Sequence, residues 1–414
     1  MAQAAVWRLG ESAPQALYFA STSSPYWQRS AASLIAAACD LPAETRTADF
    51  GGSLRAGTTA LHAAFDAVRA GSARSAAIVA SDVRDAAGGS PEELALCDAA
   101  AAVAIGPERG IADLIAASSR SDDFLDEWRC DTDRHIHSFA SKFSTARGYE
   151  ANTVAVARAV LKQAGVTPAD ISLLALASPD GKALLDVAKA LGIPAERVQV
   201  SSSADVLLTG ATMPLLVLAQ ALDQARAGDL ILAAGYGEGA DGFLFQVTEE
   251  IAALPRPLVR DARALEYPSY QIYRKLRDYL REEVSGADIS NVLWEREEPQ
   301  NMRLHATYCP KCETVHFPMT RVCDNCRNTK GLCEKPLGRT GAVFTFNKDY
   351  LYNGPVQPTV NAVVDLDGGG RFLCQMTDVD EREVEIGMRV ELVLRRLREA
   401  ESMHHYYWKC RPLE

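Results

Sequence analysis

The chain has 414 residues, of which 48% are hydrophobic and 23% are charged. These proportions are typical of an ordinary globular protein, and the length predicts two or three domains. The formal net charge of −11 argues against a general nucleic-acid binder, because such proteins need a basic surface. The sequence has no apolar run long enough to span a bilayer and no secretory signal pattern, so we expect no membrane association.

Residues 1–250 alternate short apolar runs with helical patterns. The apolar runs predict buried strands at 16–21, 76–81, 173–177 and 230–234. Apolar spacing of three and four predicts helices at 30–39, 59–70, 151–164, 184–191 and 214–225. Strands that alternate with helices favour parallel pairing, so we expect an α/β core that is covered on both faces.

This pattern ends near the prolines Pro255 and Pro257. Residues 268–283 then predict an amphipathic helix, whose apolar face consists of Tyr270, Tyr273, Leu276 and Leu280. The prolines ahead of this helix indicate a linker between domains.

Two Cys-x-x-Cys pairs follow, Cys309 with Cys312 and Cys323 with Cys326. Four thiolates from two such pairs can surround one ion, and a tetrahedral set of four sulfurs suits Zn²⁺ best. Two redox-active dithiols or disulfides are the alternative, but such a motif normally occurs once, at the start of a helix. We therefore predict a structural zinc ribbon, in which the segment between the pairs, 313–322, forms a small hairpin. The other six cysteines are scattered, which fits buried thiols in a reducing cytoplasm.

The remaining sequence predicts five strands, at 341–346, 359–366, 371–376, 389–394 and 406–410. Short strands separated by turn residues indicate a small barrel of the OB type. An OB fold can bind single-stranded nucleic acid, but that use needs a basic groove, and the segment 378–385 is acidic.

The C-terminal part resembles the zinc-ribbon and OB-fold family that accompanies thiolases. The shared features include the segment from Leu304 to Cys312, Phe317-Pro318 ahead of the second cysteine pair, the strand 341–346, and the closing run from Tyr406 to Pro412. The resemblance implies a subunit or fusion partner of enzymes that make or break C–C bonds in CoA thioesters.

The N-terminal part resembles the thiolase fold, and in particular 3-hydroxy-3-methylglutaryl-CoA synthases. The segments that carry this resemblance are 17–22, 56–61, 98–101 and 233–239. It implies two similar βα halves with catalytic groups on the loops where the halves meet. The expected fold is thus an α/β thiolase-like layered domain, followed by a rubredoxin-like zinc ribbon and a small OB-type β-barrel.

The chain departs from this family at the positions that carry the chemistry. By the resemblance, the nucleophilic cysteine before a helix is replaced by Leu54, and the general base or oxyanion donor of the second half by Ala177. A third polar position falls on Leu208. These apolar residues remove covalent acyl transfer, proton transfer and oxyanion stabilisation together.

The resemblance also predicts the domain boundaries. Residues 1–252 form a degenerate thiolase-like domain that lacks its opening strand and helix. Residues 253–300 form the linker and amphipathic helix, 301–335 the zinc ribbon and 336–414 the OB barrel.

Other polar residues offer weaker candidates for a site. His135 and His137 could act as bases or ligands, although a surface pair with hydrogen bonds is the simpler interpretation. Tyr236, Asp241, Asp180 and Lys182 could bind a ligand or shape turns.

We therefore predict an auxiliary, non-catalytic subunit that docks onto a catalytic thiolase homologue in a hetero-oligomer and shapes its acyl-CoA site. We expect structural Zn²⁺ and a CoA thioester as ligands. The alternative is an acyl-CoA C–C lyase or condensing enzyme that needs no cysteine nucleophile.

Overall fold

The computed structural model describes residues 1–10, 13–88, 90, 92–130, 133–139, 142–178, 180–199, 208–254, 258, 290–351, 357–400 and 403–413. The chain divides into an N-terminal unit, Met1–Ala36 with Leu41–Asp261, and a C-terminal unit, Ala37–Asp40 with Ala262–Glu414. The helix predicted at 268–283 lies outside the described residues.

Two four-stranded sheets form the frame of the N-terminal unit. The first has the order β2-β1-β3-β4, in which β1 (Ala16–Ala20), β2 (Arg46–Phe50) and β3 (Ala76–Asp82) are parallel and β4 (Ala99–Ile105) is antiparallel to β3. The second has the order β5-β10-β9-β8. There β8 (Leu173–Leu176) and β9 (Leu230–Tyr236) are parallel, whereas β10 (Gly239–Val247) is antiparallel to both β9 and β5 (Ala112–Ser121).

The prediction of parallel pairing is confirmed for the strands joined by helices. The strands β4, β5 and β10 were not predicted, and each is antiparallel to its neighbours. The reason is clearest at β10, because Gly237 and Glu238 alone separate it from β9. A two-residue connection can join only antiparallel strands.

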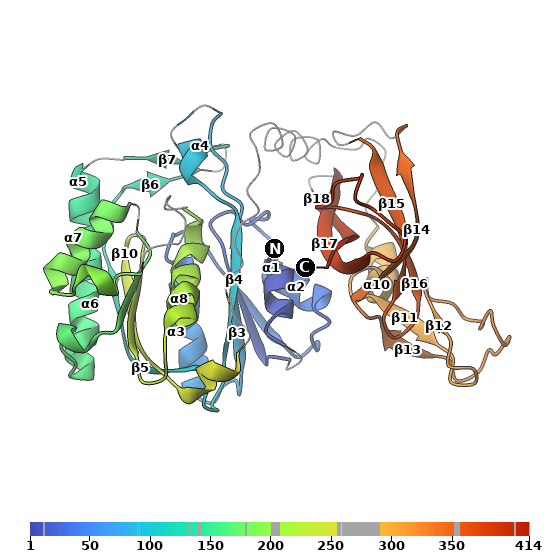
Figure 1. Cartoon of the computed structure of the whole chain (residues 1–414), viewed down its shortest axis with the longest axis horizontal. Helices are drawn as coiled ribbons and strands as arrows, with labels where there is room; N and C mark the ends of the chain where they lie inside the picture. The colour runs from blue at the N-terminus through green and yellow to red at the C-terminus, as the bar shows by residue number, and fades with distance from the viewer. Residues whose placement is uncertain are drawn as a thin grey trace. The chain divides into compact units, whose positions relative to one another are not determined.

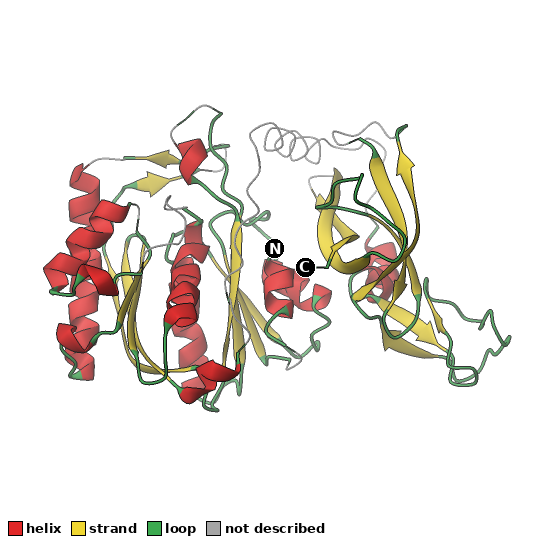
Figure 2. Ribbon diagram, viewed as in Figure 1, coloured by secondary structure: helices red, strands yellow, loops and turns green. Residues whose placement is uncertain are grey.

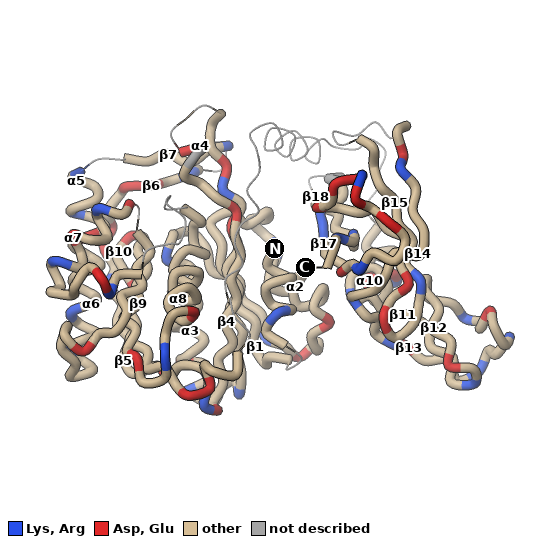
Figure 3. Tube along the Cα trace, viewed as in Figure 1, with Lys and Arg blue, Asp and Glu red and all other residues tan. Residues whose placement is uncertain are grey.

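Helices lie between the sheets and on their outer faces (Figure 1). The helices α3 (Ala56–Arg69) and α8 (Met213–Gln224) lie between the sheets, while α6 (Ala151–Ala164) and α7 (Gly181–Leu191) cover the outer face of the second sheet. The outer face of the first sheet carries α1 (Ala2–Trp7) and α2 (Ala31–Ala38). These alternating layers confirm the predicted layered α/β fold. The strands β1 and β4 of the first sheet carry no charged residue, which fits their position between layers (Figure 3).

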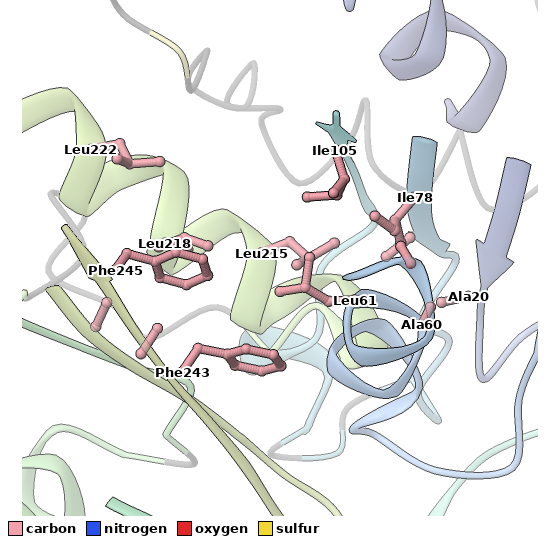
Figure 4. Packing of buried hydrophobic residues seen from close by; sticks show 14 of the residues in the cluster. Ala20, Ala60, Leu61, Ile78, Ile105, Leu215, Leu218, Leu222, Phe243 and Phe245 are labelled. Carbon is pink, nitrogen blue, oxygen red and sulfur yellow. The ribbon is translucent and has the colours of Figure 1, made fainter. Parts of the chain in front are cut away.

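The core between the sheets combines many alanines with a few large side chains (Figure 4). Leu61 of α3, Leu215 of α8 and Phe243 of β10 are each 1% exposed. Burial of one such side chain contributes about 1.5–3 kcal/mol. Along β9, side chains alternate between this core and the core under α6 and α7, as the period of a strand requires.

The helix boundaries follow local signals. Asp180 caps α7 by accepting a hydrogen bond from the amide of Ala183 at 2.7 Å. Gly192 and Gly165 end α7 and α6 at φ of 76° and 67°, where a side chain would be strained. Shorter elements complete the unit: α4 (Glu92–Ala95), α5 (Lys142–Ser144), β6 (Glu127–Trp128), β7 (His137–Ser138), a π-helical turn (Thr145–Glu150), and 3₁₀ turns at Pro168–Asp170, Ala195–Arg197, Gly210–Thr212 and Glu249–Ala253.

The C-terminal unit consists mainly of strands (Figure 2). One five-stranded sheet has the order β16-β15-β14-β17-β18. Its strands are β14 (Thr340–Asp349), β15 (Thr359–Leu366), β16 (Arg371–Gln375), β17 (Arg389–Ala400) and β18 (Met403–Pro412). A bridge between Met376 and Cys410 joins the two edges, so the sheet nearly closes into a barrel around Phe372 and Trp408. The five predicted strands and the OB-type barrel are confirmed.

The ribbon precedes the barrel and follows helix α10 (Asn291–Asn301). Its sheet has the order β12-β11-β13, with β11 (His305–Tyr308), β12 (Val315–His316) and β13 (Cys333–Pro336). The predicted hairpin within 313–322 is wrong, because β12 pairs with β11 across the first cysteine pair. Pro318 has no N–H to donate, which disfavours continuation of β12.

No helix in the parts of the chain listed above is long and apolar enough to cross a membrane.

Candidate functional site

The four predicted cysteine ligands come together in the ribbon. The ligand atoms of Cys309, Cys312, Cys323 and Cys326 all lie within 4.8 Å of one another. The Sγ atoms of Cys309 and Cys326 are 3.7 Å apart, and those of Cys312 and Cys323 are 3.4 Å apart. Four Zn–S bonds of about 2.3 Å in a tetrahedron would separate the sulfurs by about 3.8 Å. The thiols therefore fit a tetrahedral metal ion.

The two cysteine pairs adopt the same backbone turn. The amide of Glu313 donates to the carbonyl of Cys309, and the amide of Arg327 donates to that of Cys323, each at 2.8 Å. Glu313 and Arg327 both have a left-handed φ, of 57° and 61°. Repetition of this turn brings the second thiol of each pair back toward the first.

Polar side chains surround the sulfurs. Thr314 Oγ1 lies 3.2 Å from Cys312 Sγ, and this hydrogen bond is the main reason why the pKa of Cys312 falls to about 6. Asn328 Nδ2 lies 3.6 Å from Cys309 Sγ, and His316 Nε2 lies 3.2 Å from Cys323 Sγ. The hydrogen bonds from Thr314 and Asn328 favour the thiolate forms of Cys312 and Cys309, which a metal requires.

Leu54 lies two residues before helix α3, in a loop that packs against the turn between β9 and β10. A Cβ on Gly237 would lie 2.8 Å from the amide nitrogen of Arg55 and 3.0 Å from that of Leu54. The next residue, Glu238, accepts a hydrogen bond of 2.5 Å from Ser53 Oγ. The turn between β9 and β10 thus packs against the amides at the start of α3, and a carboxylate lies beside them.

Ala177 and Leu208 lie in loops of the second half. Ala177 follows β8, is buried, and donates its amide to the carbonyl of Ala234 at 3.1 Å. Leu208 donates its amide to Ala95 and accepts from the amide of Cys97. Neither Ala177, Leu208 nor Leu54 carries a titratable group, so these three side chains offer neither a nucleophile nor a base.

Acidic side chains gather near the turn between β9 and β10. The pKa of Glu238 is raised, mainly because the carboxyl group is buried. The hydrogen bond from Ser53 lowers this pKa, whereas the nearby carboxylates of Asp126 and Glu127 raise it. Tyr236 donates to Asp126 Oδ2 at 2.5 Å. Burial and this carboxylate raise the pKa of Tyr236, so its phenol stays protonated. A phenol held in this way is a poor general base.

Two buried carboxylates join the halves of the N-terminal unit. Asp241 of β10 accepts from Ser119 at 2.6 Å, from Thr58 of α3 at 2.9 Å and from Arg55 at 3.2 Å. Asp82 of β3 accepts from the loop that follows β1 and from the amide of Ala211 at 2.7 Å. Each buried carboxylate accepts several hydrogen bonds, and these bonds tie elements of the two halves together.

The weaker candidates lie in structural settings. The ring of His137 stacks on Trp128, and its side chain is 50% exposed beside Asp133. His135 is partly buried, and its Nδ1 has no hydrogen-bond partner among the described residues. Asp180 caps α7, and Lys182, 86% exposed, pairs with Asp186 on the same helix.

Two family models match parts of the chain. Residues 334–395 match the ChsH2 C-terminal OB-fold domain, and residues 161–243 match the C-terminal part of 3-oxoacyl-[acyl-carrier-protein] synthase III. The chain joins a thiolase-fold unit to a zinc-ribbon and OB-fold unit. The predicted resemblances of both parts are therefore confirmed.

Similar proteins of known sequence are hydroxymethylglutaryl-CoA synthases. That of Methanopyrus kandleri is 29% identical over 272 residues, which cover 64% of this chain and 77% of the relative. That of Picrophilus torridus is 28% identical over 274 residues, with 64% and 77% covered. The N-terminal unit is therefore related to condensing enzymes that act on acyl thioesters.

Solved structures support the same fold. The 3-oxoacyl-(acyl carrier protein) synthase III from Pseudomonas aeruginosa superposes with a TM-score of 0.53 at 23% identity, over 60% of this chain and 80% of that chain. The corresponding enzyme from Aquifex aeolicus gives 0.51 at 20% identity, over 56% and 77%. An HMG-CoA synthase complexed with CoA gives 0.51 at 16% identity, over 57% and 66%.

Sequence reasoning did not find Glu238, Asp126 or His316. Glu238 could have been noticed as the acidic residue in a glycine turn, and His316 as a histidine four residues after Cys312. The pairing of Asp126 with Tyr236 joins positions 110 residues apart and has no local signal.

Proposed function

We propose that the protein is an auxiliary, non-catalytic subunit of a cytoplasmic, thiolase-type complex that acts on C–C bonds of acyl-CoA thioesters. One observation carries this proposal. The chain has an OB barrel of the accessory type and a thiolase fold, yet Leu54 and Ala177 occupy the positions that the resemblance assigns to the nucleophile and the base. The partner would be a catalytically complete thiolase homologue, which binds the acyl-CoA.

The surroundings of Leu54 support this proposal. Catalysis of acyl transfer uses hydrogen-bond donors aimed at a developing oxyanion. Here the turn of Gly237 and Glu238 covers the amides of Leu54 and Arg55, and the Glu238 carboxylate binds Ser53. A negative charge at this place opposes an oxyanion instead of stabilising it.

The ribbon would hold one structural Zn²⁺ through Cys309, Cys312, Cys323 and Cys326. Its support is the donor set of four thiolates at tetrahedral spacing. All four positions of the ion are then filled by protein, so the metal would stabilise the ribbon and take no part in chemistry.

The test is co-expression with a thiolase homologue encoded beside this protein. We expect the two chains to purify together, and we expect acyl-CoA C–C cleavage or condensation only when the partner is present. A Leu54→Ala variant, which removes the side chain at the nucleophile position, should leave the activity of the complex unchanged. Turnover of an acyl-CoA by this chain alone at enzyme-like rates would overturn the proposal.

A further inference from the structure

His316 is the last residue of β12, the strand that follows the first cysteine pair in the chain. Its ring contacts the sulfur of Cys323, which belongs to the second pair. Its Nε2 is 3.2 Å from Cys323 Sγ, and its side chain is only 11% exposed. Thr314 and Asn328 occupy equivalent places, each two residues after the second cysteine of a pair, and belong to the repeated turns. His316 has no equivalent in the second pair, since it comes from a strand.

When a metal is bound, only one assignment of donor and acceptor is possible for this hydrogen bond. A metal-bound thiolate can only accept a hydrogen bond, so Nε2 of His316 must carry the proton and donate it to Cys323. Such a bond withdraws negative charge from the sulfur, which makes the thiolate less prone to attack. The nearly buried imidazole also excludes water from this side of Cys323.

We infer that His316 is a positioning residue of the metal centre: its hydrogen bond to Cys323 ties the two cysteine pairs together and slows loss of the ion. This inference rests on the proposed metal site. Partners that orient metal ligands typically change metal affinity by about 10- to 100-fold when they are removed.

The test compares three variants of the full chain. His316→Phe removes the donor but keeps an aromatic ring, and His316→Gln keeps a donor. Thr307→Val is the matched control, because it removes the hydrogen bonds between Thr307 and Thr320 in the same ribbon without touching a sulfur. The readouts are the rate of Zn²⁺ transfer to a chromogenic chelator and the thiolate-to-metal charge-transfer band of the Co²⁺-loaded protein.

We expect His316→Phe to release Zn²⁺ at least about tenfold faster and to shift the Co²⁺ charge-transfer band, because Cys323 becomes a stronger electron donor. His316→Gln should recover part of both effects, and Thr307→Val should change neither. Wild-type release and an unshifted band in His316→Phe would overturn the inference, as would equal effects of Thr307→Val. Absence of stoichiometric metal in the wild-type protein would instead overturn the metal site itself.

Discussion

Replacement of Asp82 by Asn should strongly destabilise the N-terminal unit. Asp82 is fully buried at the end of β3 and holds together three parts of the chain. Its Oδ1 accepts from the amides of Thr22 and Ser23 at 2.7 and 3.0 Å, and its Oδ2 accepts from the amide of Ala211 at 2.7 Å. Hydroxyl groups of the same loop, from Ser21 to Ser23, complete the set of donors.

The magnitude follows from these bonds. Hydroxyl groups can rotate to suit an amide, but backbone N–H groups cannot. If the new NH₂ group takes the place of Oδ2, it faces the buried amide of Ala211, and one unsatisfied buried donor costs about 1–3 kcal/mol. Loss of the negative charge weakens the remaining bonds, since charge-assisted bonds are about twice as strong as neutral ones. A total of about 3 kcal/mol should lower the melting temperature by about 6–12 °C for a unit of this size.

The assay is differential scanning calorimetry of the full chain, in which the transition of the N-terminal unit is followed. The control is Asp66→Asn on the exposed side of α3, which should cost less than about 0.5 kcal/mol. A melting temperature for Asp82→Asn within about 2 °C of the wild type would refute this account of the Asp82 contacts.

Three further predictions concern the ribbon, the turn beside Leu54 and the contact between helices. Cys309→Ser should abolish stoichiometric zinc binding, and with it the folding free energy that zinc supplies, which is of the order of 10 kcal/mol in zinc-finger peptides. The control is Cys333→Ser, which changes an exposed cysteine outside the cluster. Elemental analysis should find that this control retains the metal. Glu238→Gln keeps an acceptor for the Ser53 hydroxyl but removes the negative charge. Because the pKa of Glu238 is raised in the folded state, the wild-type protein loses stability as the pH rises from about 4 through that pKa. The variant should therefore have a higher melting temperature than the wild type at about pH 8 and the same melting temperature at about pH 4. If the difference in melting temperature between the two proteins is the same at both pH values, the raised pKa of Glu238 is contradicted. Gly57→Ala should lower the free energy of unfolding by about 1–3 kcal/mol in denaturant titrations, because its Cβ would lie 2.3 Å from the carbonyl oxygen of Ala211. The control is Gly181→Ala in α7, whose Cβ would meet no described atom within 4 Å. This control should be neutral or slightly stabilising.

Local patterns predicted much of the fold. The helices at 151–164 and 214–225 and the strands at 76–81 and 359–366 lie within a residue or two of the observed elements, because apolar periodicity and glycine or aspartate caps act over a few residues. The strands β4 and β5 were not predicted. Ala99–Ile105 is a run of mostly alanines, which indicates a strand only once β3 lies beside it.

The cluster of four cysteines was predicted from the sequence alone, because the spacing within each Cys-x-x-Cys pair sets the position of its thiols over four residues. The environment of Leu54 was decided by the tertiary structure. Ser53 meets Glu238 across 185 positions of sequence, and Thr58 meets Asp241 across 183. The contact of His316 with Cys323 likewise depends on how β12 pairs with β11. Residue types and their spacing can name the groups that carry chemistry, but only the packing of distant strands brings a carboxylate to a helix start or an imidazole to a thiol.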